Sequence, residues 1–322
     1  MAITWRETRP AGDVNKAWNC VAFDDTMKHA VASVSAGRFY ATLDEFNTWT
    51  EIQPAGDVDR NWVRNKMSND GKYVIIATLN GRLFTSSDYG ATFTERRPSG
   101  GDEDQAWYSV GMSANGSIQY VTNINGGQTS KGIWKSTDYG VNWTNISTTL
   151  YATCFECSDD GSVFICGIDG GKVYISTDGG ANINVKNPKA GDATGTWYAC
   201  GVSGDGTKFL CGDYAGRLYY TANAGTSWSE PRPYGDTAKN WVNCSLSRDG
   251  GMMIVAVVTP GRIHYSTDAG SNWTETQPKG DADGNWDDVK VNRNGKMFMA
   301  ADKNSRLWVG QIVTFYPNAF PL

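Results

Sequence analysis

Apolar and polar residues occur in short blocks along the chain, and residues 62–97 show the pattern clearly. Residues 62–68 predict a short strand, 72–78 a near-continuous apolar strand, 82–86 a third strand and 93–96 a fourth, polar strand. A continuous apolar run of this length is typical of a strand covered on both faces. Turn residues separate the strands, and Asn80-Gly81 predicts a tight hairpin. The segment therefore predicts four short antiparallel strands.

The same block recurs along the chain and is marked by Gly-Asp, four further residues and Trp. Successive motif tryptophans are 44, 45, 90, 44 and 45 residues apart, so one member is missing from a repeat of about 44 residues. The six copies are Gly12-Asp13 with Trp18, Gly56-Asp57 with Trp62, Gly101-Asp102 with Trp107, Gly191-Asp192 with Trp197, Gly235-Asp236 with Trp241, and Gly280-Asp281 with Trp286. Such a period is typical of propellers, solenoids or arrays. Seven units of four short strands predict an all-β fold, a seven-bladed β-propeller of four-stranded antiparallel blades.

The two ends of the chain predict how the ring closes. Residues 286–311 supply three strands of the seventh unit, and the fourth is missing there. The segment Thr4-Trp5-Arg6-Glu7 matches the fourth strands that begin at Trp49 and Trp273. We therefore predict that strand 3–8 completes the seventh blade, so that residues 1–311 form one domain without an exposed half-blade edge. Residues 312–322 follow as an apolar tail, which packs on the rim or docks on a partner.

A second motif marks the turn between the third and fourth strands. Its copies are Ser86-Ser-Asp88-Tyr-Gly90, Ser136-Thr-Asp138-Tyr-Gly140, Ser176-Thr-Asp178-Gly-Gly180, Thr221-Ala-Asn223-Ala-Gly225 and Ser266-Thr-Asp268-Ala-Gly270, with a worn copy at Thr42-Leu-Asp44. The Asp or Asn side chain can accept hydrogen bonds within its own turn, and Gly permits positive φ. An aromatic residue follows three positions after the Gly in most copies.

This pattern resembles the Asp-box, or BNR, repeat. Chains with that repeat include sialidases, xyloglucan-degrading glycosidases, sortilin-type receptors and the photosystem II assembly factor family. The resemblance implies a propeller fold and no particular chemistry, because one fold can carry many functions.

Composition and charge narrow the classes of partner. The net charge of −5 and the pI of about 5.1 argue against a nucleic-acid or anionic membrane surface as the partner. No apolar run is long enough to insert into a membrane, and the N-terminus lacks the apolar segment of a signal peptide. We therefore expect synthesis in the cytoplasm, and association with a virion is compatible with it. Seven cysteines are best explained as buried thiols, with one cross-strand disulfide between Cys200 and Cys211 as the alternative.

Propeller topology predicts that the Gly-Asp loops share one face with the basic residues that begin the third strands. The candidate ligand-binding residues on this face are Asp13, Asp57, Asp102, Asp192, Asp236, Asp281, Trp18, Trp62, Trp107, Trp197, Trp241, Trp286, Arg38, Arg82, Arg217 and Arg262. One hypothesis is a multivalent glycan site, in which Trp faces stack on sugars while Asp and Arg bond hydroxyls. The structural alternative pairs Asp with Arg as surface salt bridges, each worth about 0–1 kcal/mol, and buries the tryptophans between blades. Calcium is a third hypothesis, from Asp57-x-Asp59 and its equivalents, although each loop has few carboxylates.

The fourth unit departs from the pattern. The loop before it, residues 145–151, has neither Gly-Asp nor Trp, and we place the start of this blade near Tyr151. The preceding blade has an enlarged hairpin at residues 123–131. Both changes are expected on the Gly-Asp face and next to each other. A specific partner contact and simple drift are both compatible with this gap.

Catalysis is the less favoured hypothesis. Only two histidines occur, His29 and His264, so a His-based triad or His-rich metal site is not expected. Cys154 and Cys157 lie in one strand and point to opposite faces. A glycosidase needs two unlike carboxylates at a set separation, and here the acidic residues are members of repeats.

We therefore assign no catalytic residue, metal or cofactor. The sequence predicts a non-catalytic binding or scaffold propeller that recognises a macromolecular partner, a glycan or a protein, through the Gly-Asp face. The alternatives are a structural or receptor-binding component of a virion or tail assembly, and a glycoside hydrolase of the Asp-box propeller type.

Overall fold

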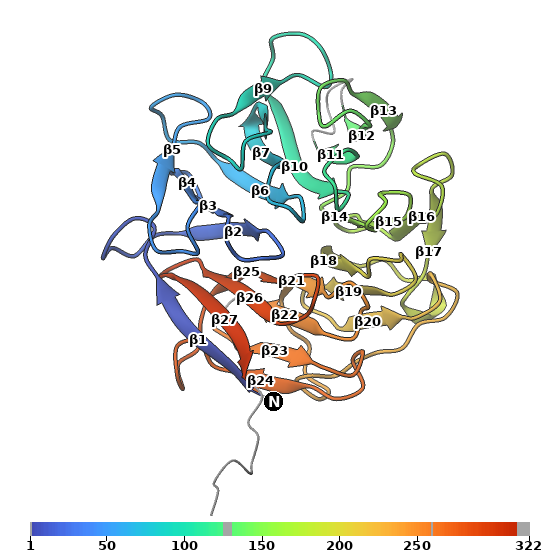
Figure 1. Cartoon of the computed structure of the whole chain (residues 1–322). Helices are drawn as coiled ribbons and strands as arrows, with labels where there is room; N and C mark the ends of the chain where they lie inside the picture. Colours follow the sequence, from blue (N-terminus) through green and yellow to red (C-terminus); the bar gives the residue numbers. More distant parts are fainter. Residues whose placement is uncertain (1, 125–130, 259, 314–322) are drawn as a thin grey trace, which may run out of the picture.

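The computed structural model describes residues 2–124, 131–258 and 260–313, which form a ring of antiparallel sheets around a central axis (Figure 1). The innermost strands are β2 (Trp18–Phe23), β6 (Trp62–Met67), β10 (Gln105–Met112), β14 (Cys154–Cys157), β18 (Trp197–Val202), β21 (Trp241–Leu246) and β25 (Trp286–Val291). The second strands are β3 (Ala30–Val34), β7 (Val74–Gly81), β11 (Gln119–Asn123), β15 (Phe164–Gly167), β19 (Phe209–Asp213), β22 (Met253–Val257) and β26 (Met297–Asp302).

The third strands are largely buried, whereas the fourth strands are mostly short and exposed. The third strands are β4 (Phe39–Thr42), β8 (Leu83–Ser86), β12 (Gly132–Ser136), β16 (Val173–Ser176), β20 (Leu218–Thr221), β23 (Ile263–Ser266) and β27 (Leu307–Val313). The fourth strands are β5 (Thr50–Ile52), β9 (Thr94–Arg96), β13 (Thr144–Ser147), β17 (Asn184–Lys186), β24 (Thr274–Thr276) and β1 (Ala2–Thr8). In the fifth sheet a bridge between Tyr220 and Ser229 stands in the place of a fourth strand. We number the blades 1 to 7 from β2 to β25, and the predicted all-β propeller is confirmed.

The seventh blade combines the two ends of the chain. Its strand order is β25-β26-β27-β1, and β1 pairs antiparallel with β27 from Ala2 opposite Val313 to Thr8 opposite Leu307. The indole N–H of Trp5 donates to Thr276 Oγ1 of blade 6 at 2.6 Å. Strand β27 continues two residues beyond the predicted end of the repeat, to Val313, and the remaining tail lies outside the described residues.

A ring of hydrogen bonds joins neighbouring blades close to the axis, at the turns between first and second strands. In six junctions a backbone N–H donates to the backbone carbonyl of the next blade at 2.8–2.9 Å. The donors and acceptors are Asp25 to Asn69, Asn69 to Ala114, Ala114 to Asp159, Asp159 to Gly204, Gly204 to Arg248 and Arg248 to Arg293. At the seventh junction the Arg293 N–H donates instead to the carboxylate of Asp25, at 3.0 Å. The ring of seven links thus closes through one side chain.

The two faces of the ring carry different connections. The hairpin between second and third strands pairs with the loop that enters the next blade, as at Gly37 with Arg60 and Gly261 with Gly284. The same contact between Gly81 and Gln105 lies within β7 and β10, which joins the sheets of blades 2 and 3 into one. We call this side the Gly-Asp face and the opposite side, with the turns between third and fourth strands, the Asp-turn face.

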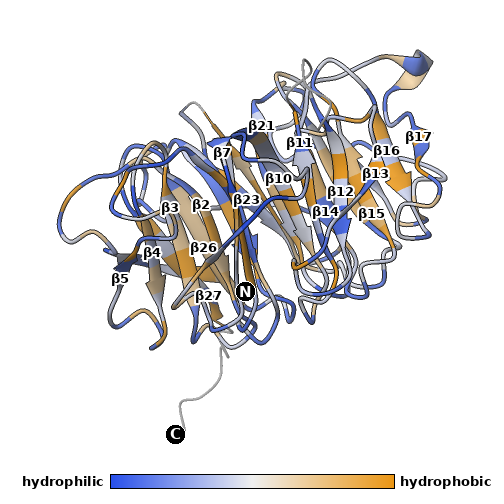
Figure 2. Cartoon of the chain, turned by 90° about the horizontal axis from the view of Figure 1, so that it is seen from above, coloured by the Kyte–Doolittle hydropathy of each residue, from blue (hydrophilic) through white to orange (hydrophobic). Residues whose placement is uncertain are grey.

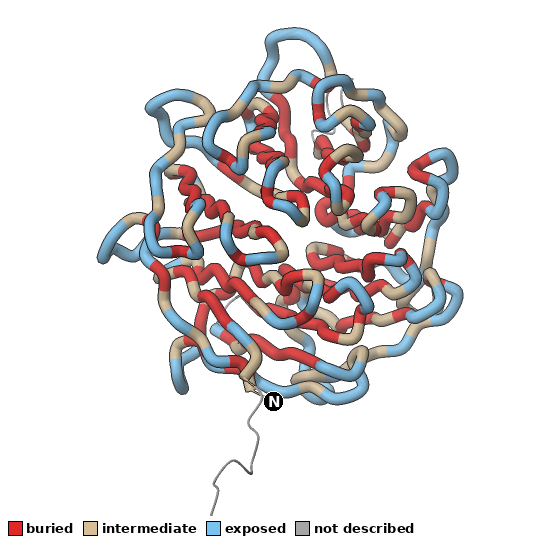
Figure 3. Tube along the Cα trace, viewed as in Figure 1, coloured by how far each residue is buried: buried red, intermediate tan, exposed pale blue. Residues whose placement is uncertain are grey.

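The core lies between blades rather than within one central cluster. Second strands such as β3, β11 and β22 are buried along their whole length, because a neighbouring blade covers each of their faces. Buried residues therefore follow the first three strands of each blade, while loops at the rim are exposed (Figure 3). Hydrophobic residues are correspondingly concentrated in the strands (Figure 2). All seven cysteines are free and buried in this core, and Cys200 lies opposite Cys211 in register without a disulfide. Burial raises the pKa of Cys20 and Cys157 to about 12, so these thiols are unreactive.

The turns between third and fourth strands share one hydrogen-bond pattern. The Ser86 hydroxyl donates to Asp88 at 2.7 Å and accepts from the Gly90 N–H at 3.0 Å, while the Thr92 N–H donates to Asp88 at 2.9 Å. The turns at Ser136, Ser176, Thr221 and Ser266 repeat these three contacts. In blade 1 the Gly position is taken by Phe46, at a φ of 67°. Its ring is buried where blade 7 lacks a turn of its own.

Deleting residues 1–9 should destabilise the protein strongly, because β27 becomes an open edge and Trp5 no longer covers blade 6. We expect the melting temperature to fall by about 10 °C or more. A matched pair of point variants tests the same contact: Trp5→Ala should cost about 3 kcal/mol, whereas the neighbouring exposed Thr4→Ala should cost little. Thermal and chemical unfolding measure both. A deletion variant that melts like the full chain would contradict closure by β1.

The Asp-turn carboxylates should make stability depend on acid. The Asn182 N–H and amide, with Ser176, lower the pKa of Asp178 to about 2, and similar contacts lower the pKa of Asp88, Asp138 and Asp268. A carboxyl group whose pKa is lowered by folding stabilises the fold above its unfolded pKa, about 3.9, and that contribution is lost as the pH falls through the folded value. We expect the melting temperature to fall between about pH 4 and pH 2 for this reason.

Replacing these four aspartates by Asn should weaken the acid dependence while keeping the fold, since Asn223 already occupies the equivalent position in blade 5. The control variant replaces four exposed aspartates of the Gly-Asp face by Asn: Asp13, Asp57, Asp236 and Asp281. Equal acid dependence of the two variants would show that the turns are not responsible.

Candidate functional site

The Gly-Asp face brings the predicted aspartates and basic residues together at the blade junctions. At the junction of blades 1 and 2, Arg38 contacts Asp57 at 2.8 Å, Asp59 at 2.9 Å and Glu51 at 3.7 Å. Corresponding contacts join Arg82 to Asp102 and Asp104, Lys172 to Asp192, Arg217 to Asp236, Arg262 to Asp281 and Asp283, and Arg306 to Asp13. Six of the seven junctions therefore carry an ion pair between a hairpin and the next Gly-Asp loop.

The partners of these ion pairs differ in exposure. The six motif aspartates have side chains that are 73–93% exposed, whereas the side chains of Arg38, Arg82 and Arg262 are 18–30% exposed. The arginine stems thus pack on the blade and hold the carboxylates at the surface. Salt bridges that are exposed in this way contribute little to stability.

The six motif tryptophans lie in the core. Each is at most 2% exposed, and the indole N–H of Trp62 donates to the Gly37 carbonyl of the preceding blade at 2.8 Å. Trp197, Trp241 and Trp286 make the same bond to Gly171, Gly216 and Gly261. The rings therefore offer no face to a ligand in this structure. The expectation that they stack on sugars is replaced by a packing role, because burying the indole and satisfying its N–H both join neighbouring blades.

In the loops proposed to bind calcium, the carboxylates form ion pairs with arginine side chains. Asp57 and Asp59 both point to Arg38, and Asp281 and Asp283 both point to Arg262. Throughout the described ranges no three His, Cys, Asp or Glu side chains are grouped so that they could hold a metal ion. Three junctions, blades 1–2, 2–3 and 6–7, have three carboxylates around one arginine. The junctions of blades 1–2 and 6–7 carry a local surplus of two negative charges, whereas Arg97 reduces the surplus between blades 2 and 3 to one.

The gap at blade 4 is real but its register differs from the prediction. Cys154 pairs with Gly167 as Ala199 pairs with Gly212, so Ala152, not Tyr151, occupies the place of the motif Trp. Ala152 is buried, whereas Tyr151 is 43% exposed. A small apolar residue can fill this buried position, and Tyr151 points outward because it lies one residue earlier. The Asn145 amide contacts the Lys131 carbonyl at 3.3 Å, so the two altered segments adjoin, although residues 125–130 lie outside the described part.

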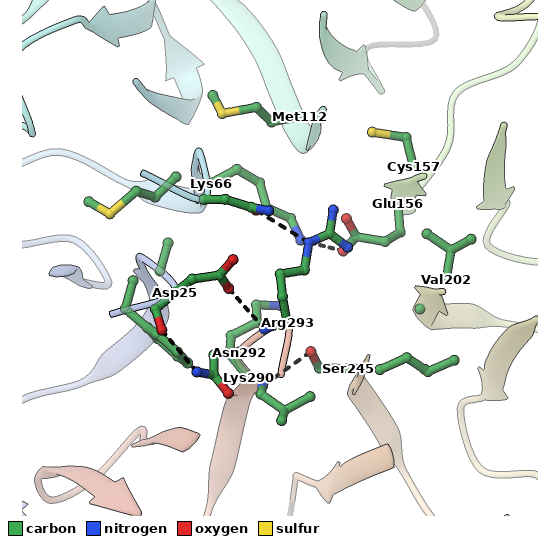
Figure 4. A pocket seen from close by; sticks show the side chains of 17 residues that line it. Asp25, Lys66, Met112, Glu156, Cys157, Val202, Ser245, Lys290, Asn292 and Arg293 are labelled. Carbon is green, nitrogen blue, oxygen red and sulfur yellow. Dashed lines mark hydrogen bonds and ion pairs between the residues drawn. The ribbon is translucent and has the colours of Figure 1, made fainter. Parts of the chain in front are cut away.

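Sequence reasoning did not identify the axial channel, where the ends of all seven innermost strands meet (Figure 4). A cavity of about 100 Å³ lies there, at the end of the channel that faces the Asp-turn side. Its charged wall residues are Asp25, Lys66, Glu156, Lys290 and Arg293. Lys66 of blade 2 forms an ion pair with Glu156 of blade 4 across the channel, and the Lys290 ammonium lies 3.1 Å from Asp288.

Arg293 crosses the mouth of this cavity. Its guanidinium pairs with Asp159 of blade 4, and its Nε donates to Asn69 of blade 2 at 3.2 Å. Burial lowers the pKa of Arg293, and burial raises the pKa of Asp25. Burial is the strongest influence against the charge of Lys290, but Asp288, Cys20 and Glu156 together leave the pKa of Lys290 raised.

The channel had a signal in the sequence. Lys66, Glu156 and Lys290 occupy the same register position in the innermost strands of blades 2, 4 and 7, and otherwise small residues such as Ala22 and Gly201 stand there. Lys66, Glu156 and Lys290 all line the axial cavity. The arrangement can bind or neutralise charge. Glu156 is engaged by Lys66, and Asp159 by Arg293 and Arg248. Asp25 instead accepts the Arg293 backbone N–H and forms no ion pair in the described part of the chain.

Comparison with known proteins identifies the class of fold. No protein-family model and no curated protein sequence matches the chain. Solved propeller structures do: a GH74 xyloglucanase from Xanthomonas campestris superposes with a TM-score of 0.74 at 13% identity, over 95% of this chain and 53% of that one. This chain thus spans about half the length of the xyloglucanase.

Two structures of YCF48 match over nearly their whole length. YCF48 bound to D1 peptide has a TM-score of 0.72 at 11% identity, over 98% of this chain and 96% of that one. YCF48 from Cyanidioschyzon merolae has a TM-score of 0.69 at 12% identity, over 95% and 98%. At such identities the likeness defines the fold, a β-propeller, and not the activity.

The one helix in the described ranges is a three-residue 3-10 turn (Ala190–Asp192), and no helix there could span a bilayer.

Packing and surface roles on the Gly-Asp face can be separated by two variants. Trp62→Ala should cost about 3–5 kcal/mol, because it empties a buried site between blades. Asp57→Ala should cost about 1 kcal/mol or less, because its ion pair is exposed. Chemical denaturation measures both free energies of unfolding. If the Trp62→Ala protein were as stable as the parent, the packing role of this indole would be contradicted and a ligand-binding role would again be the better hypothesis.

Proposed function

We propose that this protein is a non-catalytic binding propeller that recognises a protein partner through its Gly-Asp face. The observation that carries the proposal is the set of exposed carboxylates held at fixed positions around this face by part-buried arginines. A rigid and repeated array loses little conformational freedom on binding, which favours association.

Charge indicates the chemistry of the partner surface. The carboxylate surplus lies at the junctions of blades 1–2 and 6–7, around Arg38 and Arg262. Lysine and arginine side chains of a partner would complement it and steer its approach. Among the described residues, the junction of blades 3 and 4 has no such ion pair, so the face is not uniform around the ring and offers a partner one orientation.

Two considerations favour a protein over a glycan. The buried tryptophans remove the aromatic platforms on which sugar rings would stack. Among the structures of the same fold, YCF48 has been solved bound to a peptide, which shows that such a propeller can serve protein recognition. A hydrolytic role is less favoured, since two of the channel carboxylates, Glu156 and Asp159, are paired with cations.

The test compares two sets of four substitutions that each remove four negative charges. The face variant carries Asp57→Asn, Asp59→Asn, Asp281→Asn and Asp283→Asn. The control variant carries Asp70→Asn, Asp160→Asn, Asp205→Asn and Asp249→Asn in the turns between first and second strands, where Asn115 shows that an amide is accepted. Binding to an array of synthetic peptides graded in Lys and Arg content, and to a glycan array, is measured for all three proteins.

The parent and the control should bind the cationic peptides, and the face variant should bind at least about tenfold more weakly, since it loses several charge pairs. Binding should weaken as salt is added. Equal loss in both variants would reduce the effect to net charge and contradict the proposal. The proposal would also be overturned if the parent bound glycans and no peptide, and if the face variant still bound those glycans.

A further inference from the structure

The axial channel continues beyond the cavity of Figure 4 into a narrower one. This second cavity has a volume of about 20 Å³, and Lys66, Glu156 and Lys290 line both cavities. The narrow part adds Arg64, Ser109 and Asn243 to the wall. A space of this size exceeds the roughly 10–15 Å³ that one water-sized group requires. The channel therefore offers room for one small occupant beside several cations.

The walls of the two cavities carry more positive than negative side chains. Arg64, Lys66, Lys290 and Arg293 contribute four cations, while Asp25 and Glu156 contribute two carboxylates. This surplus stands out in a chain whose net charge is −5. Behind the wall Asp288 contacts Lys290 and Asp159 contacts Arg293, so the cations lie at the cavity surface while two of the four balancing carboxylates lie behind it.

Of the four cations, Arg64 alone has no direct ion-pair partner among these carboxylates. In the described part of the chain no carboxylate oxygen lies within 4.0 Å of its guanidinium, and its hydrogen bond goes to the Val63 carbonyl at 3.0 Å. Burial is the strongest influence against its charge, while Cys20, Tyr108, Asp288 and Asp287 act from a longer range and leave the pKa of Arg64 raised. By contrast Lys66 has Glu156, Lys290 has Asp288 and Arg293 has Asp159.

A guanidinium held in a narrow protein channel without a counter-ion is costly, because the channel solvates it less well than bulk water does. An anion in the adjoining cavity would offset that cost. It would meet three cations from two blades, Arg64 and Lys66 of β6 and Lys290 of β25, and the wall also includes the hydroxyl-bearing Ser109 of β10. Glu156, the carboxylate common to both walls, is already neutralised by Lys66.

We propose that the axial channel binds one small anion between Arg64, Lys66 and Lys290. The ligand is a halide or a single carboxylate group, since the narrow cavity has no room for a larger anion. The wider cavity at the mouth gives access from the Asp-turn face, past Arg293. The site is separate from the carboxylate array on the opposite face.

Thermal unfolding of the full chain in sodium salts at constant ionic strength tests the site. Chloride, bromide, formate and acetate are compared with gluconate, which is too large for the cavity. The melting temperature should rise with the logarithm of the small-anion concentration above its Kd, as one-site binding to the folded state requires. Stabilisation by chloride and bromide assigns a halide, and stabilisation by formate and acetate alone assigns a carboxylate. The same curve in gluconate and in every small anion would overturn the proposal.

A variant and a direct observation complete the test. Arg64→Gln should weaken the apparent affinity for the anion by about tenfold or more, since it removes the charge that lacks a partner. Arg60→Gln is the control, because Arg60 is exposed and lies outside both cavities. Crystals of the parent protein grown in bromide should show an anomalous peak beside Arg64. The crystallographic measurement uses the parent protein, so it tests the site even if Arg64→Gln fails to fold. The absence of an anomalous peak in the channel of bromide-grown crystals would contradict a halide site.

Discussion

Closure of the ring is the constraint on which the rest of this structure depends. Each blade buries its faces only against its two neighbours, so one open junction would expose the apolar surfaces of two blades. Six junctions close by a backbone hydrogen bond between successive turns, and the seventh closes through the Asp25 carboxylate. The seam is also tied by β1, which pairs with β27 over its whole length. The same seam leaves the buried Trp18 indole N–H without the hydrogen bond that Trp62 makes.

Repetition places chemically similar residues in very different surroundings. Arginine and aspartate on the Gly-Asp face are exposed enough for water and salt to screen them, so they shape a surface more than they stabilise the fold. Lysine, arginine and glutamate in the axial channel are enclosed, and there each charge needs a partner. The protein therefore presents negative charge at one face and lines the cavities at its axis with more cations than carboxylates. Those two features carry the two proposals and do not depend on each other.

The similar solved structures show why fold and function must be argued separately here. A xyloglucanase and YCF48 share this architecture with the chain at 11–13% identity. What they share is the packing of blades, which needs small and apolar residues at repeated positions. The residues that would distinguish partners lie on loops and in the channel, where the packing of the fold places few demands on residue type.

Much of the fold could be predicted from the sequence because its signals are local and repeat in register. Strand lengths, hairpin turns, the Ser86–Gly90 type of turn and the match of Trp5 to Trp49 and Trp273 all lie within one unit of about 44 residues. Comparison of the units was enough to predict that the N-terminal segment supplies the missing fourth strand of the seventh blade. The burial of the motif tryptophans was one of two alternatives that the same pattern allowed.

Only the tertiary structure decided which alternative holds and where charge gathers. Ala152 rather than Tyr151 fills the buried place in blade 4, because strand register there depends on pairing with β15. Lys66 and Glu156 are 90 residues apart and meet only because ring closure brings the inner strands of blades 2 and 4, on either side of blade 3, together at the axis. A repeat read along the chain gives each residue its position within a blade. The contacts across the channel arise from closing the ring, and no single repeat contains them.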